Sequence, residues 1–137
     1  MAIRGVQANP ADDFSVRANG AITQYMAVVL NSIENGDHIV ALPSAARDVC
    51  HGIIQETAAA SGDRVLVRRS GTSYVIADSA ITLGRPLMVG AGATGHVNDV
   101  ASSSWASGDG LIGYAEEAAT ASGDKIVARL QLMEIMP

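Results

Sequence analysis

The chain has 137 residues, of which 48% are hydrophobic and 17% charged, and its formal net charge is −5. This length and composition indicate one globular domain with a modest core. Its nine lysines and arginines are scattered and do not form the basic patch of a nucleic-acid-binding protein. No apolar run reaches transmembrane length, and residues 1–10 lack the features of a signal peptide. We therefore expect neither a nucleic acid nor a membrane as a partner.

Residues 1–20 show no sustained hydrophobic period and contain turn-forming pairs such as Asn19-Gly20. We interpret them as an extended N-terminal arm, followed by a single β-domain over 21–137. The apolar residues of the arm would be unfavourable on a purely solvated tail. They are candidates for contact with another protein subunit: Ile3, Val6, Phe14 and Val16.

From residue 21 onward, short β-rich runs alternate with turns. The clearest run is 125–135, where apolar and polar residues alternate with the period of two that is typical of a half-buried strand. We expect strands at 25–30, 38–42, 49–55, 64–69, 73–76, 86–89, 110–115 and 125–135. The Gly/Ser-rich segment 91–107 is expected to be an irregular loop. Its Trp105 is either a further contact residue or a cap over one end of the domain.

Glycine-aspartate pairs precede three of these strands. Glycine permits a positive φ, and the aspartate carboxylate can accept hydrogen bonds from nearby backbone N–H groups. A calcium site would need further carboxylates at short, fixed spacing, which the sequence lacks. The pairs are therefore predicted to be structural turns: Gly36 and Asp37, Gly62 and Asp63, and Gly123 and Asp124.

One segment occurs twice. GIIQETAAASGDRVLVR at 52–68 aligns with GYAEEAATASGDKIVAR at 113–129, and eight of the 17 positions are identical. This similarity predicts a duplicated unit of about 60 residues, with repeats at roughly 22–69 and 81–132. Two β-units that bury their faces against each other predict an all-β fold, either a small β-sandwich or a partly closed β-barrel.

The sequence contains no recognised catalytic or metal-binding pattern. GAGATG at 90–95 matches a phosphate-binding motif by letter, but no helix is expected after it. One cysteine, Cys50, and three scattered histidines do not have a metal-ligand spacing. We expect Cys50 to be a small buried residue. We expect no catalytic residue, metal or cofactor, and we do not expect an enzyme.

ITLGRPLMV at 81–89 and IGYAEEAATASGDKIV at 112–127 resemble the capsid decoration, or cement, proteins of tailed bacteriophages, a family built on a duplicated small β-unit. The resemblance implies a protein that is made in the host cytoplasm and joins the outside of the virion capsid. There it would bridge subunits of the major capsid protein and stabilise the shell, commonly as a homotrimer. Two alternatives remain open: another virion β-module, such as a head-fibre base or tail adaptor, and a ligand- or carbohydrate-binding β-module.

Overall fold

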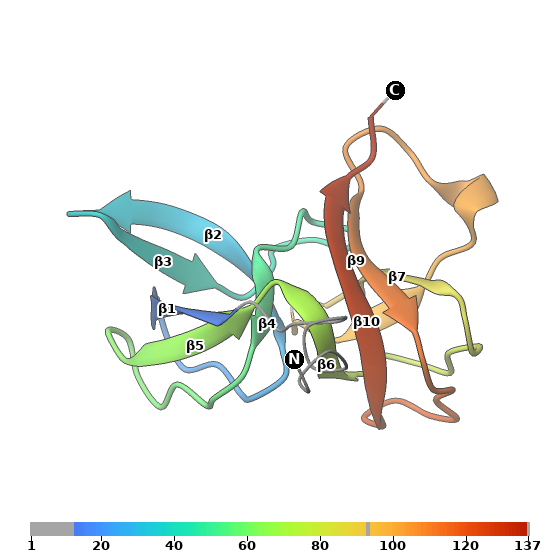
Figure 1. Ribbon diagram of the computed structural model, residues 1–137, viewed down its shortest axis with the longest axis horizontal. Helices are drawn as coiled ribbons and strands as arrows, with labels where there is room; N and C mark the ends of the chain where they lie inside the picture. Colours follow the sequence, from blue (N-terminus) through green and yellow to red (C-terminus); the bar gives the residue numbers. More distant parts are fainter. Residues whose placement is uncertain (1–12, 93, 137) are drawn as a thin grey trace, which may run out of the picture.

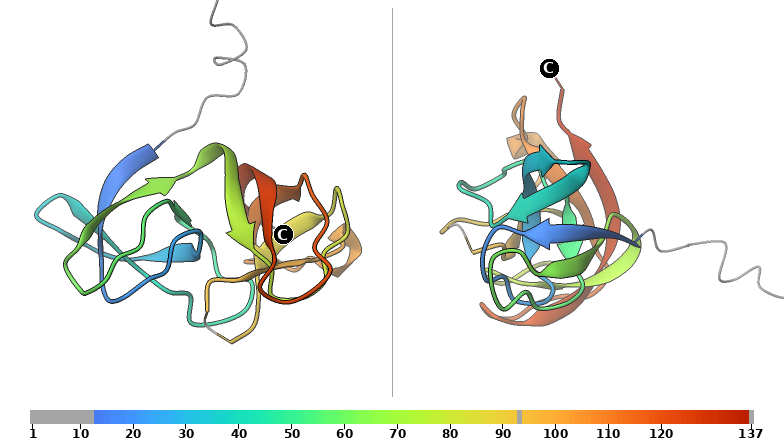
Figure 2. Two further views of the ribbon diagram at one scale, coloured as in Figure 1. Left: turned by 90° about the horizontal axis from the view of Figure 1, so that it is seen from below. Right: turned by 90° about the vertical axis from the view of Figure 1, so that its left-hand side faces the viewer.

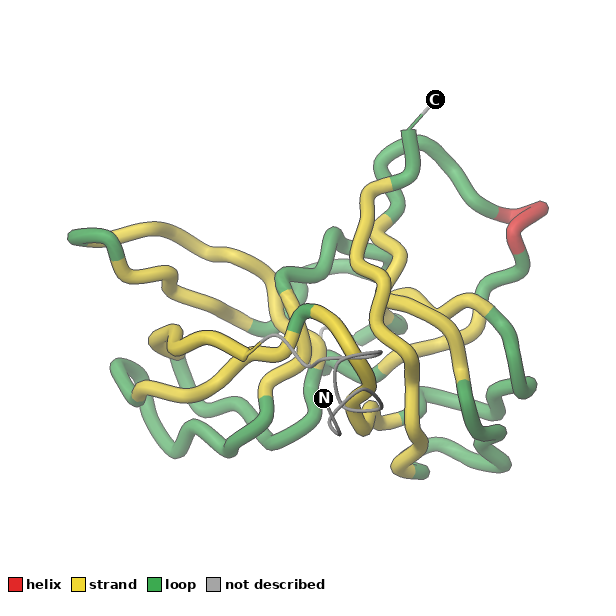
Figure 3. The backbone as a smooth tube through the Cα atoms, in the orientation of Figure 1, coloured by secondary structure: helices red, strands yellow, loops and turns green. Residues whose placement is uncertain are grey.

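A computed structural model describes residues 13–92 and 94–136. Within these ranges the fold is all-β, as predicted from the sequence, and its only helical turn, η1, lies between β8 and β9 (Figure 3). In chain order the elements are β1 (Asp13–Ala18), β2 (Ala27–Glu34), β3 (Asp37–Ala41), β4 (Gly52–Ile54), β5 (Arg64–Arg68), β6 (Ser70–Ile76), β7 (Pro86–Val89), β8 (Val97–Asp99), η1 (Ser102–Ser104), β9 (Gly110–Ala115) and β10 (Lys125–Glu134).

The strands form two units that lie side by side along the long axis (Figures 1 and 2). Strands β1 to β5 close into a barrel in the order β1-β3-β2-β4-β5, and strands β6 to β10 form a sheet in the order β6-β10-β9-β7-β8. Each neighbouring pair in the second unit corresponds to a pair five strands earlier. The exception is the pair β1 and β3, which forms a parallel ladder in the first unit. In the second unit, the corresponding strands β6 and β8 are joined only by an isolated parallel bridge between Ala77, just after β6, and Val97. The second unit therefore repeats the barrel in a less completely closed form.

The repeated sequence makes repeated hydrogen bonds. Asp63 accepts bonds from the backbone N–H groups of residues 59 and 60, and Asp124 accepts them from residues 120 and 121. Glu56 accepts the N–H of Leu66, and Glu117 accepts the N–H of Val127. The side chains shared by the two copies therefore hold the same turn in each unit.

The arm predicted over 1–20 must be shortened, because residues 13–18 form strand β1 of the barrel. Phe14, Val16 and Ala18 alternate with more polar residues, and Val16 is fully buried. Every residue from Asp13 to Arg17 pairs with β5. The sequence did not predict this strand because its alternation is short and is followed by a turn-forming pair. Its partner strand, β5, also lies far along the chain. Residues 1–12 lie outside the described residues.

Two apolar clusters form the core. One fills the barrel and contains Val16, Val28 and Ile54. The other lies mainly under the second sheet but also includes Ala27, Cys50 and Ile53 from the first unit. The two units are therefore joined through a shared core. Cys50 is 5% exposed, and burial raises the pKa of its thiol to about 12, so the thiol stays protonated.

Part of the first unit extends beyond its barrel. Strands β2 and β3 form a hairpin that reaches away from the rest of the molecule (Figure 1). Its turn, at Asn35 and Gly36, has two successive positive φ values of 51° and 83°, the arrangement of a two-residue hairpin turn. The matching strands of the second unit, β7 and β8, are shorter. The extension of this hairpin is therefore specific to the first unit.

Candidate functional site

A cleft of about 410 Å³ opens at the junction of the two units, where β5 continues into β6. It is lined by Tyr25, Gln55, Arg68, Thr72, Ser73, Tyr74 and Val127. Most of these residues are not apolar, and several come from strands that connect the barrel to the second sheet. The cleft is therefore a polar hollow in the surface of the molecule.

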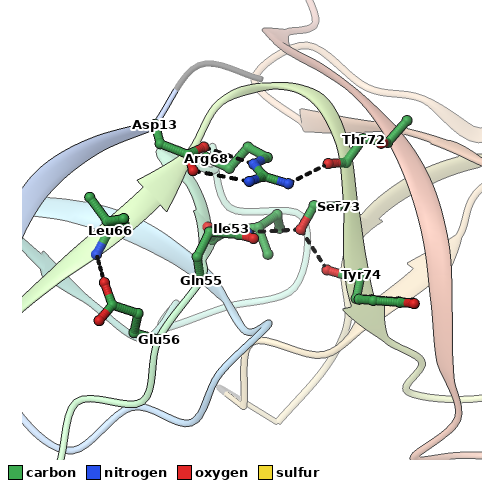
Figure 4. Close-up of polar contacts among 9 residues, drawn as sticks. All are labelled: Asp13, Ile53, Gln55, Glu56, Leu66, Arg68, Thr72, Ser73 and Tyr74. Atoms are coloured by element: carbon green, nitrogen blue, oxygen red, sulfur yellow. Dashed lines mark hydrogen bonds and ion pairs between the residues drawn. The ribbon is translucent and has the colours of Figure 1, made fainter. Parts of the chain in front are cut away.

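Arg68, Gln55 and Ser73 of the cleft are already hydrogen-bonded within the chain (Figure 4). Arg68 makes a bidentate pair with Asp13, at 2.7 Å from Nε to Oδ1 and 3.0 Å from Nη2 to Oδ2, and its Nη1 donates to the Thr72 carbonyl at 2.9 Å. The hydrogen bond to Asp13 raises the pKa of Arg68. Gln55 Nε2 donates to Ser73 Oγ at 2.9 Å. These bonds fix β1, β4, β5 and β6 relative to one another, so the cleft is preformed.

Tyr25 occupies a position whose backbone favours glycine. Its φ is 70°, and the corresponding residue of the second unit is Gly84, with φ of 82°. Each residue donates its N–H across the unit, to the carbonyl of Ile54 or of Ala115. A left-handed tyrosine costs on the order of 1 kcal/mol. The first unit therefore has a strained backbone at the position that carries this aromatic ring. The ring contacts Tyr74 edge-to-face, at 5.3 Å between ring centroids.

Phe14, one of the expected contact residues, belongs to a cluster with His38 on β3 and His51 just before β4. Its ring lies edge-on to His38 and His51, at 5.9 and 5.5 Å between centroids, and His38 Nδ1 is 3.1 Å from His51 Nε2. Arg69 approaches the Phe14 ring at 5.9 Å. Burial, Arg69 and His38 all lower the pKa of His51. Phe14 is thus largely engaged by its own chain, and its surroundings favour the neutral form of His51.

We expect the protein to lose stability as the pH falls from about 7.5 to about 5.5. The folded state keeps the pKa of His51 below its ordinary value of 6.5, so in this range the unfolded chain binds a proton that the folded chain does not. The contribution of His51 to stability is complete at a pH above its unfolded-state pKa, and it is lost as the pH falls below that pKa towards the lower pKa of the folded state. Thermal melts should show a smaller acid-induced decrease for His51→Gln than for the wild type. An equal decrease in both would assign the effect to other groups.

The other predicted contact residues have different positions. Val16 is fully buried in the barrel, so it cannot contact a partner, and that prediction is corrected. Trp105 follows η1 and is half-buried, and its Nε1 donates to the Val100 carbonyl at 3.0 Å. Arg47 of the first unit holds the same loop through Asp109 and the Ser104 carbonyl. Ile3 and Val6 lie outside the described residues.

The glycine-aspartate pairs lie at turns. Gly36, Gly62 and Gly123 have φ values of 83°, 92° and 91°. Asp63 and Asp124 accept backbone N–H bonds, and these bonds lower the pKa of Asp124. Asp37 instead pairs with Arg17 and Arg64 at 3.1 and 2.9 Å. In the part of the chain that the structure describes, no group of three or more His, Cys, Asp or Glu residues is placed to hold a metal ion.

Sequence reasoning missed the tyrosines of the cleft. Tyr25 and Tyr74 lie far apart in the chain, and only the fold brings them together. The available signal was the alignment of the repeats, which places Tyr25 opposite Gly84. A bulky residue at a position where the other copy has glycine indicates a side chain that is present despite an unfavourable positive φ.

Comparisons with known proteins identify two similarities. A family model described as phage cement protein matches residues 6–130. The crystal structure of the head fiber gp8.5 N base in bacteriophage phi29 has a similar fold, with a TM-score of 0.65 and 18% sequence identity, covering 93% of this chain and 100% of that chain. A search of curated protein sequences found no match. Among the described residues, no helix has the length and apolar character needed to span a membrane.

Proposed function

Because the chain belongs to the phage cement protein family, we propose that it binds the outer surface of a phage capsid and stabilises the shell by bridging subunits of the major capsid protein. The chain is a structural protein of the virion. The observation that carries the proposal is the extent of the family match, which includes β1 to β9 and part of β10 and therefore both units.

The architecture is suited to bridging. Two β-units share one core cluster, and Arg47 of the first unit pairs with Asp109 of the second at 3.0 Å. A body held together in this way can transmit load between two contacts without deforming. A protein that binds only the assembled shell stabilises it by its binding free energy, and many copies on one lattice multiply the effect.

We propose that the chain acts as a homotrimer on the capsid. Three copies held around one axis would bind the shell together, so modest individual contacts would give strong attachment. The exposed large apolar residues of the described part are spread over several elements, among them Leu30 on β2, Leu83 before β7 and Met136 after β10. This surface favours weak self-association in solution and assembly on the particle.

The proposal is tested with capsids assembled without the chain. Addition of purified protein should saturate the particles at a fixed copy number and raise the temperature or denaturant concentration at which shells release their contents. Major capsid protein that has not assembled should bind much less, because one subunit offers only part of a bridging site. Equal binding to free and assembled subunits, with no gain in shell stability, would contradict the proposal.

The fold shared with the N base of a phage head fibre supports a second candidate, in which the chain is the base of a fibre. The two candidates differ in what lies above the bound chain. Images of intact virions would show an elongated density rising from each base in the second case and none in the first. Shell stabilisation by the isolated chain favours the cement role.

A further inference from the structure

One outward face of the second sheet carries aromatic and basic side chains together. Tyr74 on β6 lies opposite Val127 of β10, and Tyr114 on β9 lies opposite Arg129 of β10. Tyr25 joins them from the first unit by its contact with Tyr74. All three tyrosines of the chain are therefore on or beside this face. We call it the tyrosine face and define it by Tyr25, Tyr74, Tyr114, Lys125 and Arg129.

The two basic residues of this face lie against tyrosine rings. Lys125 Nζ is 4.5 Å from the centre of the Tyr74 ring and 5.6 Å from that of Tyr25. The Arg129 guanidinium carbon is 5.3 Å from the centre of Tyr114. Such contacts contribute only about 0.5–1 kcal/mol at exposed sites. The rings hold the cations in place without neutralising their charge.

Within the described ranges, neither Lys125 nor Arg129 lies within 4.0 Å of a carboxylate, whereas four other arginines do: Arg17, Arg47, Arg64 and Arg68. The acidic group bonded to the same strand is Glu117, whose Oε1 accepts the backbone N–H of Val127. The tyrosine face therefore presents available positive charge on a protein whose net charge is −5.

The repeat supplies an internal comparison. Arg64 and Arg68 of β5 align with Lys125 and Arg129 of β10, so both copies carry two outward basic residues. In the first unit Asp37 and Asp13 neutralise them. In the second unit tyrosines take the place of those aspartates as neighbours. The two outward surfaces have thus diverged, and only that of the second unit is left open to an external acidic group.

The face also continues into the cleft. Tyr25, Tyr74 and Val127 line that hollow of about 410 Å³, and Tyr74 is 41% exposed. Tyrosine and arginine are enriched where protein interfaces concentrate their binding energy. The face combines a row of such residues with a preformed recess into which a partner side chain can insert.

We propose that the tyrosine face is the surface with which this chain docks on an acidic region of the capsid subunit. The inference rests on the capsid-binding function proposed above and adds the surface and the chemistry of its partner. Charge complementarity favours an acidic partner, and the tyrosine rings supply rigid contact area around each cation. Because the cations are not paired internally, binding a carboxylate on the shell does not require an existing ion pair to break.

The test measures binding of purified variants to capsids that lack the chain. Lys125→Gln combined with Arg129→Gln, and separately Tyr74→Ala, should each weaken binding by about tenfold or more. The double variant should also lose most of the salt dependence that the wild type shows between about 50 and 300 mM salt. The matched control is Arg64→Gln at the position aligned with Lys125, which should bind within about twofold of the wild type. Melting curves verify that each variant is folded.

Each outcome has one meaning. If the wild type does not bind capsids, the proposed function fails. If the wild type binds and the folded variants bind equally well with equal salt dependence, the tyrosine face is not the docking surface and the inference is overturned. If the variants keep their affinity for the shell but change the association of the chain with itself, the face joins copies of the chain, which also overturns the inference.

Discussion

Replacement of Gly113 with alanine is expected to destabilise the protein by about 3 kcal/mol. Gly113 lies on β9 opposite Leu130 of β10. A Cβ atom at this position would overlap the carbonyl oxygen of Arg129 and lie 2.9 Å from its carbonyl carbon and 3.0 Å from the Cα of Leu130. These are backbone atoms in the centre of a sheet, so relief requires the two strands to separate.

Denaturant unfolding of Gly113→Ala would measure this loss. Gly20→Ala is the matched control, because a Cβ at position 20 meets nothing within 4 Å, and it should change stability by less than about 0.5 kcal/mol. Gly52, the repeat partner of Gly113, is also crowded, since a Cβ at position 52 would lie 2.8 Å from the Arg68 carbonyl oxygen. A Gly113→Ala protein as stable as the wild type would show that the close approach of β9 and β10 is not required.

Ile53→Ala is expected to cost about 4 kcal/mol and to weaken both units at once. Strand β4 is buried on both faces, and its two isoleucines belong to different clusters: Ile54 to the barrel and Ile53 to the core under the second sheet. Ile53 is fully buried. Its truncation therefore leaves a cavity at the place where the units meet.

Amide hydrogen exchange separates a shared effect from a local one. Protection should fall in β9 and β10 as well as in β4, and unfolding should remain one transition. Ile33→Ala, at a position 58% exposed on the hairpin, should leave protection in both units nearly unchanged. Loss of protection confined to β1 to β5 would mean that the two units are energetically independent.

The sequence predicted the duplicated all-β fold because the repeat preserves residues that form turns. The shared glutamate and aspartate make the same local hydrogen bonds in both copies. Such contacts join residues near in sequence, so a sequence pattern records them directly. The resemblance to phage cement proteins, which rested on the segments 81–89 and 112–127, is confirmed by the family match over 6–130.

The elements missed by sequence reasoning depend on partners distant in the chain. Strand β1 is defined by its pairing with β5, and β8 by its pairing with β7 inside a segment expected to be an irregular loop. The expected strand at 49–55 is observed only as Gly52–Ile54, since Val49 and Cys50 precede the point where β4 meets β5. In each case tertiary pairing decided the boundary.

The tyrosine face could not be predicted for a related reason. Lys125 and Arg129 appear in the sequence as the ordinary polar positions of an alternating strand, and so do Arg64 and Arg68. The two pairs of basic residues differ in their neighbours on the adjacent strands. Between the basic residues, Leu66 of the first unit lies opposite Ser15, whereas the aligned Val127 of the second unit lies opposite Tyr74. Register is a property of the folded sheet, so a single strand does not reveal which of its charges are neutralised.

The central claim is that each copy bridges capsid subunits from outside the shell. Cryo-electron microscopy of capsids assembled without the chain and then saturated with it tests this claim most directly. We expect density on the outer surface around local three-fold positions, with every copy contacting at least two major capsid subunits. Density inside the shell, or copies that each contact a single subunit, would contradict it.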